Sequence, residues 1–158
     1  MKRVETTLLL IIKNNKIMLA RKKRGFGEGK FNGVGGKIKE DESPYDAAIR
    51  ECQEEVGVTP LNIRKYGEIE FIEPYKGERE NVIFHLYLTD EYDGELKASD
   101  EMEPHWFSLN NIPYDKMFAD DSYWLPYILD DKKIKAYFEF DDNWNIIRKF
   151  IKEVENFD

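Results

Sequence analysis

The sequence predicts an α+β fold, because segments rich in strand-forming residues are interspersed with two helices. The plainest strand is Val82 to Thr89, and the plainest helix is Pro44 to Val56, which has recognisable start and stop residues. The chain has 158 residues, 41% of them hydrophobic, and contains no repeat or linker. These features fit one domain, spanning residues 1–158, with a substantial buried core.

Charge and cysteine content narrow the classes of function. The net charge is −8, so the chain lacks the basic surplus that binding to nucleic-acid polymers or anionic membranes requires. A small phosphorylated substrate could still bind through divalent ions and local lysines and arginines. The single cysteine, Cys52, excludes an internal disulfide, and we expect a cytoplasmic protein. The N-terminal apolar run is broken by Lys13 and lacks a small-residue cleavage site, so it predicts a strand rather than a signal peptide.

The first 37 residues predict a hairpin followed by a glycine-rich loop. A hydrophobic strand at Thr6 to Ile12, a turn at Asn14-Asn15 and a returning strand at Lys16 to Ala20 form the hairpin. Arg21 to Lys37 then holds six of the ten glycines and six basic residues, which suits a flexible loop or a phosphate cradle. Its spacing fits neither a P-loop nor a dinucleotide fingerprint. Three residues of this loop could line a pocket or, equally, pack on the core: Phe26, Phe31 and Asn32.

The helix from Pro44 to Val56 has clear boundaries. Ser43 can accept a hydrogen bond from an orphan N–H, and proline suits the first helical position. Gly57 can take the left-handed conformation that closes many helices. At about 100° per residue, five residues share an apolar face that can pack on a core: Tyr45, Ala48, Ile49, Cys52 and Val56.

A carboxylate cluster, Glu51, Glu54 and Glu55, gathers on a different face of this helix. Like charges within about one turn repel one another, so a nearby cation is expected to compensate them. Arg50 can help to orient a carboxylate or a phosphate. Carboxylate oxygens suit Mg²⁺ or Mn²⁺, and such ions commonly serve phosphate-ester chemistry. The alternative is a solvated acidic helix face without a ligand.

The middle of the chain predicts two strands joined by polar connections. Leu61 to Ile72 and Val82 to Thr89 are the strands, and Pro74 to Asn81 connects them. Asp90 to Asp100 predicts an acidic loop, and His105 to Leu109 a short strand.

The two histidines do not indicate a metal or catalytic site. His85 lies within a predicted strand, where a structural role is expected, and His105 has no evident partner. This placement argues against a zinc site or a histidine-based triad.

The C-terminal third predicts a loop, a helix and closing strands. Residues 110–121 form the loop, and an aspartate pair at its end could cap a helix from Ser122 to Asp131. Ala136 to Phe140 alternates as a strand does. Trp144 to Val154 fits helical spacing as well as a strand.

The helix and its flanks resemble the Nudix family. Gly36, Glu42 and the run from Arg50 to Val58 follow the pattern of a complete Nudix box, with Cys52 and Val58 in its aliphatic positions. The resemblance implies a Nudix-type α/β/α sandwich, in which a mixed β-sheet is flanked by helices, and makes the final segment a strand. It also implies an enzyme that hydrolyses a nucleoside triphosphate to the monophosphate and pyrophosphate with Mg²⁺, for which Mn²⁺ could substitute.

The resemblance assigns metal and catalytic roles to particular residues. The metal ligands would be the carbonyl of Gly36 and four carboxylates, those of Glu51, Glu54, Glu55 and Glu101. Arg50 belongs to the same catalytic group. Either Glu54 or Glu101 could be the general base, and the sequence does not choose between them.

Outside the box, the chain is similar to Nudix proteins that hydrolyse oxidised purine nucleoside triphosphates such as 8-oxo-dGTP and so cleanse the nucleotide pool. The resemblance rests on residues 22–37, 99–107 and 119–126. It places three residues at the purine edge, Asn32, Asp120 and Asp121, and five in the surrounding pocket: Thr7, Lys22, Phe26, Phe71 and Trp124. We expect one aspartate to be protonated and to donate a hydrogen bond while the other accepts one.

Two positions depart from that subgroup. Phe118 stands where a base-stacking tryptophan is usual, and Val82 stands where a methionine is common, so a smaller stacking surface is expected. The substrate could instead be a normal nucleotide, a dinucleoside polyphosphate or ADP-ribose. The chain could also be a ligand-sensing Nudix module without turnover, or its acidic helix could be purely structural. The expected partner is a small-molecule nucleotide; the sequence leaves the oligomeric state open and is compatible with a monomer.

Overall fold

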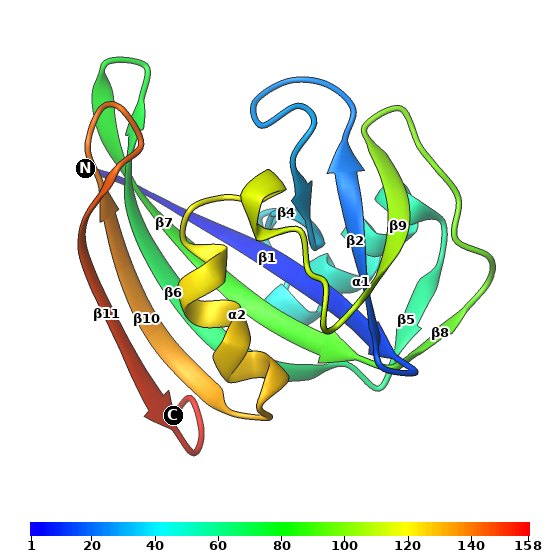
Figure 1. Cartoon of the computed structure of the whole chain (residues 1–158). Coiled ribbons are helices and arrows are strands. Elements are labelled where there is room, and N and C mark those ends of the chain that lie inside the picture. The colour runs from blue at the N-terminus through cyan, green and yellow to red at the C-terminus, as the bar shows by residue number, and fades with distance from the viewer.

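A mixed β-sheet of nine strands forms the centre of the computed structural model, which describes residues 1–158 (Figure 1). Two α-helices, α1 (Pro44–Val56) and α2 (Asp121–Leu129), and a short 3-10 helix, η1 (Tyr114–Lys116), accompany it. The strands are β1 (Lys2–Lys13), β2 (Lys16–Lys22), β3 (Phe31–Asn32), β4 (Val34–Lys37), β5 (Thr59–Leu61), β6 (Arg64–Tyr75), β7 (Glu78–Thr89), β8 (Glu91–Asp93), β9 (Met102–Ser108), β10 (Lys133–Phe140) and β11 (Ile146–Val154).

The sheet follows the order β11-β10-β6-β7-β1-β2-β3, with β4 paired to β1 and β9 paired to β2. The β1–β7 and β6–β10 pairs are parallel, and the other pairs of this sheet are antiparallel. A separate two-stranded sheet joins β5 to β8. The long strand β1 therefore lies at the middle of the sheet and contacts strands from both halves of the chain.

Each face of the sheet carries a hydrophobic core. On one face, α2 packs through Trp124, Leu125 and Ile128 against β6 and β10. On the other face, α1 packs through Ala48, Cys52 and Val56 against β1 and β2. Figure 1 shows α2 in front of the sheet and α1 behind it. This arrangement confirms the predicted α+β fold with a mixed sheet flanked by helices.

Helix α1 begins and ends where the sequence predicts. The Ser43 hydroxyl accepts a hydrogen bond from the N–H of Asp46, and Gly57 closes the helix in the left-handed conformation. The predicted apolar face needs a correction, because Tyr45 is 45% exposed while Ala47 is fully buried. Glu55 is also buried, so the cluster of glutamates extends from the surface toward the core.

Several predicted loops contain strand structure. The glycine-rich segment holds β3 and β4, and β4 pairs with β1 through glycines that offer no periodic side-chain pattern. The predicted connection from Pro74 to Asn81 is wrong: β6 and β7 continue through it and turn at Lys76-Gly77, both with positive φ. The acidic loop contains β8, and β9 begins at Met102, three residues before the predicted strand.

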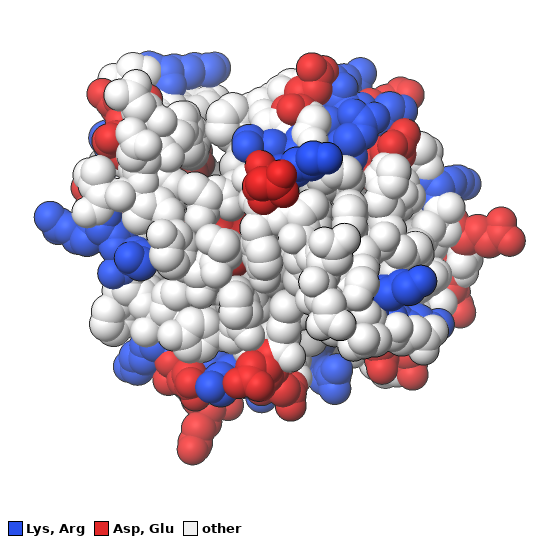
Figure 2. Space-filling model, in the orientation of Figure 1, with Lys and Arg blue, Asp and Glu red and all other residues white.

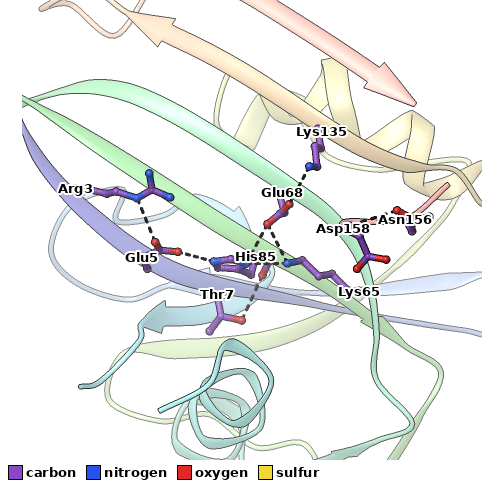
Figure 3. Close-up of polar contacts among 9 residues, drawn as sticks. All are labelled: Arg3, Glu5, Thr7, Lys65, Glu68, His85, Lys135, Asn156 and Asp158. Atoms are coloured by element: carbon purple, nitrogen blue, oxygen red, sulfur yellow. Dashed lines mark hydrogen bonds and ion pairs between the residues drawn. The ribbon is translucent and has the colours of Figure 1, made fainter. Parts of the chain in front are cut away.

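His85 belongs to a charged network on the sheet (Figure 3). Its Nε2 lies 2.7 Å from a carboxylate oxygen of Glu5, and its Nδ1 lies 3.0 Å from the Nζ of Lys65. Glu68 accepts from Lys65 and also faces Lys135. The network therefore joins four strands, β1, β7, β6 and β10. This arrangement fits the structural role expected of His85. The expectation that His105 has no partner is wrong, because Glu103 lies 2.6 Å from it.

Neither helix is long and apolar enough to cross a membrane.

Candidate active site

Two adjoining cavities contain almost all of the predicted site residues. The larger has a volume of about 790 Å³ and the smaller about 430 Å³. Both are lined by Glu51, Glu55 and Glu101, so they meet at the acidic face of α1. In the orientation of Figure 1, the centre of the molecular surface is largely uncharged and the charged side chains gather toward its rim (Figure 2).

All nine residues expected to bind substrate line the larger cavity, although they come from six separate stretches of the chain: Thr7, Lys22, Phe26, Asn32, Phe71, Phe118, Asp120, Asp121 and Trp124. Gly36 lines the same cavity, whereas Glu54 lines only the smaller one. Val82 is buried and lines neither cavity.

Close packing between β4 and α1 builds the acidic end. Glu51 lies against the backbone of Gly36, where an added Cβ would come within 2.7 Å of the carboxylate. Glu55 is 8% exposed and accepts a hydrogen bond of 3.4 Å from the N–H of Gly35. Burial, followed by the charge of Glu51, raises the pKa of Glu55 to about 8. A side chain at position 36 would therefore displace the Glu51 carboxylate from its place against the strand.

Arg50 orients three of the surrounding carboxylates. Its guanidinium binds both oxygens of Glu42, at 2.8 and 2.9 Å, and reaches Glu51 at 2.7 Å and Glu54 at 3.3 Å. It also donates to the carbonyl of Lys37 at 3.1 Å. The hydrogen bonds from Arg50 lower the pKa of Glu42 to about 2. The predicted orienting role of Arg50 thus corresponds to a set of short, charge-assisted contacts.

The donors at the acidic end are carboxylate oxygens, which suit a divalent cation. However, no three of these carboxylates lie together in a position to hold one ion. Arg50 holds Glu51 and Glu54, and Arg24 lies 3.5 Å from Glu101. Glu55 is buried beside Glu51 with a raised pKa, which is the situation that a doubly charged ion would relieve. The metal ligands proposed from the sequence therefore fit the site by identity and position, and their coordination stays a prediction.

The opposite end of the larger cavity holds two buried aspartates. Asp120 is 6% and Asp121 3% exposed. The indole N–H of Trp124 donates to Asp120 at 2.8 Å, and the N–H of Phe118 donates to Asp121 at 3.0 Å. Burial raises the pKa of Asp120 to about 6, and burial together with the charge of Asp120 holds the pKa of Asp121 well above its usual value. Asp120 makes no capping bond to α2, so the alternative of a simple helix cap is wrong for it.

The loop after β2 brings aromatic and basic side chains to the cavity. Gly27, with φ of +80°, lies so close to Phe118 that an added Cβ would be 2.8 Å from its ring. Phe26 stacks on Phe118 with ring centroids 5.9 Å apart. Lys30 reaches over the Phe118 ring at 5.7 Å and donates to the carbonyl of Met117.

The lining residues that the sequence did not single out include Lys30, Glu73 and Trp144. Glu73 lies on β6 between the predicted strand, which ends at Ile72, and the predicted connection, so its strand pairing with Glu80 could not be expected. Trp144 was assigned to the closing segment, but it lies in the turn before β11. The excess of basic residues in the glycine-rich loop was the one sequence feature that pointed to Lys30.

The chain belongs to the Nudix hydrolase family, since the NUDIX domain model matches residues 1–128. Members of this family use divalent metal ions. The chain is 41% identical over 150 residues to the oxidized purine nucleoside triphosphate hydrolase of Danio rerio, with 95% of each chain covered. It is 39% identical over 151 residues to the protein of that name from Mus musculus, with 96% of each covered. The resemblance to this family is thereby confirmed.

A solved structure agrees with the fold. The crystal structure of a mutator MutT protein from Bacillus halodurans superposes with a TM-score of 0.83 at 21% identity, covering 94% of this chain and 97% of that one. The share of this chain that it covers is larger than residues 1–128, which the family model matches.

Proposed function

We propose that this protein hydrolyses oxidised purine nucleoside triphosphates, such as 8-oxo-dGTP, to the nucleoside monophosphate and pyrophosphate in a Mg²⁺-dependent reaction. The observation that carries the proposal is the continuous cavity, which has carboxylates of α1 at one end and a buried aspartate pair at the other. The carboxylates of α1 would bind the triphosphate through a metal ion, and the aspartate pair would bind the purine edge. The names of the two animal relatives support the same substrate class.

At the acidic end, Gly36, Glu51, Glu54, Glu55 and Glu101 would hold the ion. Bound Mg²⁺ would offset the charge of the phosphate oxygens and favour an ionised water nucleophile. Arg50 keeps Glu51 and Glu54 in place between turnovers through its short contacts. Glu54 or Glu101 accepts the proton of the attacking water as it forms its bond to the α-phosphorus. The bond between that phosphorus and the bridging oxygen breaks, and pyrophosphate leaves.

At the other end, the aspartates bind the purine edge. Asp120 accepts hydrogen bonds as a carboxylate because it is already held by the N–H of Trp124. Asp121, whose pKa is raised further, is the protonated partner and donates. Asn32 lies within the same cavity, with its side-chain oxygen accepting from the N–H of Gly33, so its amide N–H is the group available to the base. A base that presents both donors and acceptors fits this edge.

The proposal includes a single domain over residues 1–158, a cytoplasmic location and a small-molecule nucleotide as the partner. A monomer is sufficient, because both ends of the cavity are built from one chain.

A substrate screen tests the proposal. Release of the nucleoside monophosphate would be measured by chromatography in Mg²⁺ for 8-oxo-dGTP, dGTP, dATP, a dinucleoside polyphosphate and ADP-ribose, with Glu54→Gln as the impaired variant. Glu40→Gln is the matched control, because Glu40 is an exposed glutamate outside both cavities. We expect the oxidised purine to have the highest kcat/KM, Glu54→Gln to lose activity by about 10²-fold or more, and Glu40→Gln to match the wild type.

Three outcomes would contradict the proposal in different ways. Faster turnover of ADP-ribose or a dinucleoside polyphosphate would assign another substrate. Nucleotide binding without pyrophosphate release would indicate a sensing module. Unchanged activity of Glu54→Gln would remove Glu54 from the reaction.

A further inference from the structure

The turn between β10 and β11 is a rigid, internally bonded structure. One carboxylate oxygen of Asp141 accepts from the N–H groups of Asn143 and Asn145, each at 2.9 Å. The backbone N–H of Asp141 donates to the carbonyl of Asn145, and the N–H of Trp144 donates to the carbonyl of Asp141. The turn therefore holds Trp144 in one conformation.

That conformation is unusual for a tryptophan. Trp144 has a φ of +62°, in the left-handed region that bulky residues rarely adopt. Such a backbone persists where its surroundings determine it, and it often marks a functional position. Here the result is that the indole points back over the sheet, toward Phe140 on β10, with ring centroids 5.4 Å apart.

A second contact fixes the turn to the neighbouring hairpin. Arg79 on β7 donates to the carbonyl of Phe140 and pairs with the carboxylate of Asp142 at 3.4 Å. Figure 1 shows the β10–β11 turn beside the tip of the β6–β7 hairpin. The position of Trp144 is thus set by two parts of the chain that are distant in sequence.

The indole of Trp144 lines the larger cavity. Its ring centroid is 5.0 Å from that of Phe26, which in turn stacks on Phe118. Phe26 comes from the loop after β2, so the contact between Phe26 and Trp144 bridges two separate loops. Phe26 is 62% exposed, and an aromatic ring exposed at a cavity mouth is suited to covering a flat ligand.

We propose that Trp144 contacts the purine base of the substrate and supplies aromatic surface to a pocket in which Phe118 offers only a phenyl ring. This inference rests on the proposed function, because it takes the larger cavity as the base site. The C-terminal hairpin, which lies outside the residues matched by the family model, then completes the substrate site of this chain. Arg79 and Asp141 act as positioning residues for Trp144.

Binding measurements with two Trp144 variants test the proposal. The probe is a purine triphosphate analogue whose α,β-bridging oxygen is replaced by methylene, titrated calorimetrically in Mg²⁺. Inorganic tripolyphosphate is the probe without a base. The matched control is Ile147→Ala, because Ile147 is a 57% exposed apolar residue of the same hairpin that does not line the cavity.

We expect Trp144→Ala to weaken binding of the analogue about tenfold and Trp144→Phe to weaken it by about two- to threefold, as loss of base stacking requires. Affinity for tripolyphosphate should be unchanged, and Ile147→Ala should match the wild type for both probes. In the wild type, the analogue should also quench tryptophan emission, and Trp144→Phe should lose most of this change. The emission measurement keeps the test valid if the alanine variant fails to fold.

The outcomes separate this inference from the proposed function. Wild-type affinity of Trp144→Ala for the analogue, or equal weakening of both probes, overturns the role of Trp144 while hydrolysis of oxidised purines stands. A wild type that binds the analogue in a Trp144-dependent way without hydrolysing any purine triphosphate overturns the proposed function alone. A wild type that binds no purine triphosphate overturns both.

Discussion

Replacing Glu73 by glutamine should stabilise the protein in a pH-dependent way. Glu73 on β6 is the direct cross-strand partner of Glu80 on β7, and it lines the larger cavity. Like charges directly opposite each other on a sheet are destabilising. Burial, then the charge of Glu80, then that of Asp120 raise the pKa of Glu73 to about 7. All three causes act in the same direction, so the folded protein favours the neutral acid.

The sign of the effect follows from this raised pKa. Between the unfolded pKa of 4.5 and about 7, the unfolded chain releases the proton of Glu73 while the folded chain keeps it. Wild-type stability therefore falls as pH rises through that window and is not reduced further above it. The pKa difference between the unfolded and folded states corresponds to at most about 3 kcal/mol of unfolding free energy. Because Glu73 is only half-buried, screening by water in the cavity reduces this to about 1–2 kcal/mol.

Urea unfolding at pH 5, 6, 7 and 8, with EDTA present, would measure this difference. Glu73→Gln should resemble the wild type near pH 5, gain on it up to pH 7 and then keep a constant margin. Glu78→Gln, which removes an exposed glutamate of the neighbouring strand, is the control and should show no such trend. A margin that is the same at pH 5 and pH 8, or a similar trend in the control, would refute the reasoning.

Three further predictions concern the two ends of the cavity. Arg50→Ala should lower the free energy of unfolding by about 2–3 kcal/mol, because it leaves three carboxylates without their cation, and millimolar Mg²⁺ should restore part of the loss in urea titrations. In thermal unfolding, Mg²⁺ at a hundred times its Kd should stabilise the wild type by about 2.7 kcal/mol, and Glu55→Gln should lose most of this gain; an equal gain in both would place the ion elsewhere. Affinity for a purine triphosphate should fall as pH rises through the raised pKa of Asp121, because the donor proton of Asp121 is then lost. Asp121→Asn should flatten this dependence, whereas a pH-independent wild type would contradict the protonated aspartate.

The helix and its carboxylates could be predicted from the sequence because their determinants are local. Ser43, Pro44 and Gly57 fix the ends of α1 by short-range hydrogen bonding and backbone preference, and the helical period then places the glutamates. The pairing of β4 with β1 could not be predicted in this way. Its glycines carry no hydrophobic period, and their fit depends on the backbone of Thr7, which is distant in sequence and is brought close only by the register of β1.

The pocket residues show the same division between local and long-range determinants. The aspartate pair precedes a helix, which local reasoning explains as capping, and only the structure shows that Asp120 is buried and makes no capping bond. Glu73 and Trp144 are placed by strand pairing and by a turn with positive φ, neither of which leaves a periodic pattern. The family resemblance pointed to the residues of the Nudix box and of the expected base pocket. It gave no indication of Glu73 or Trp144.

The distribution of charge explains how an acidic chain can bind a polyanion. Carboxyl groups stand at both ends of the cavity, yet they differ in what they require. At the α1 end, we expect the glutamates to bind phosphate only through a cation. Three lysines also line the larger cavity: Lys22, Lys30 and Lys37. At the other end, burial raises the pKa values of Asp120 and Asp121, so we expect those groups to recognise a base through a shared proton rather than through charge. Metal dependence and base selectivity should therefore vary independently: removing the ion weakens the phosphate contacts, whereas raising the pH weakens the base contacts.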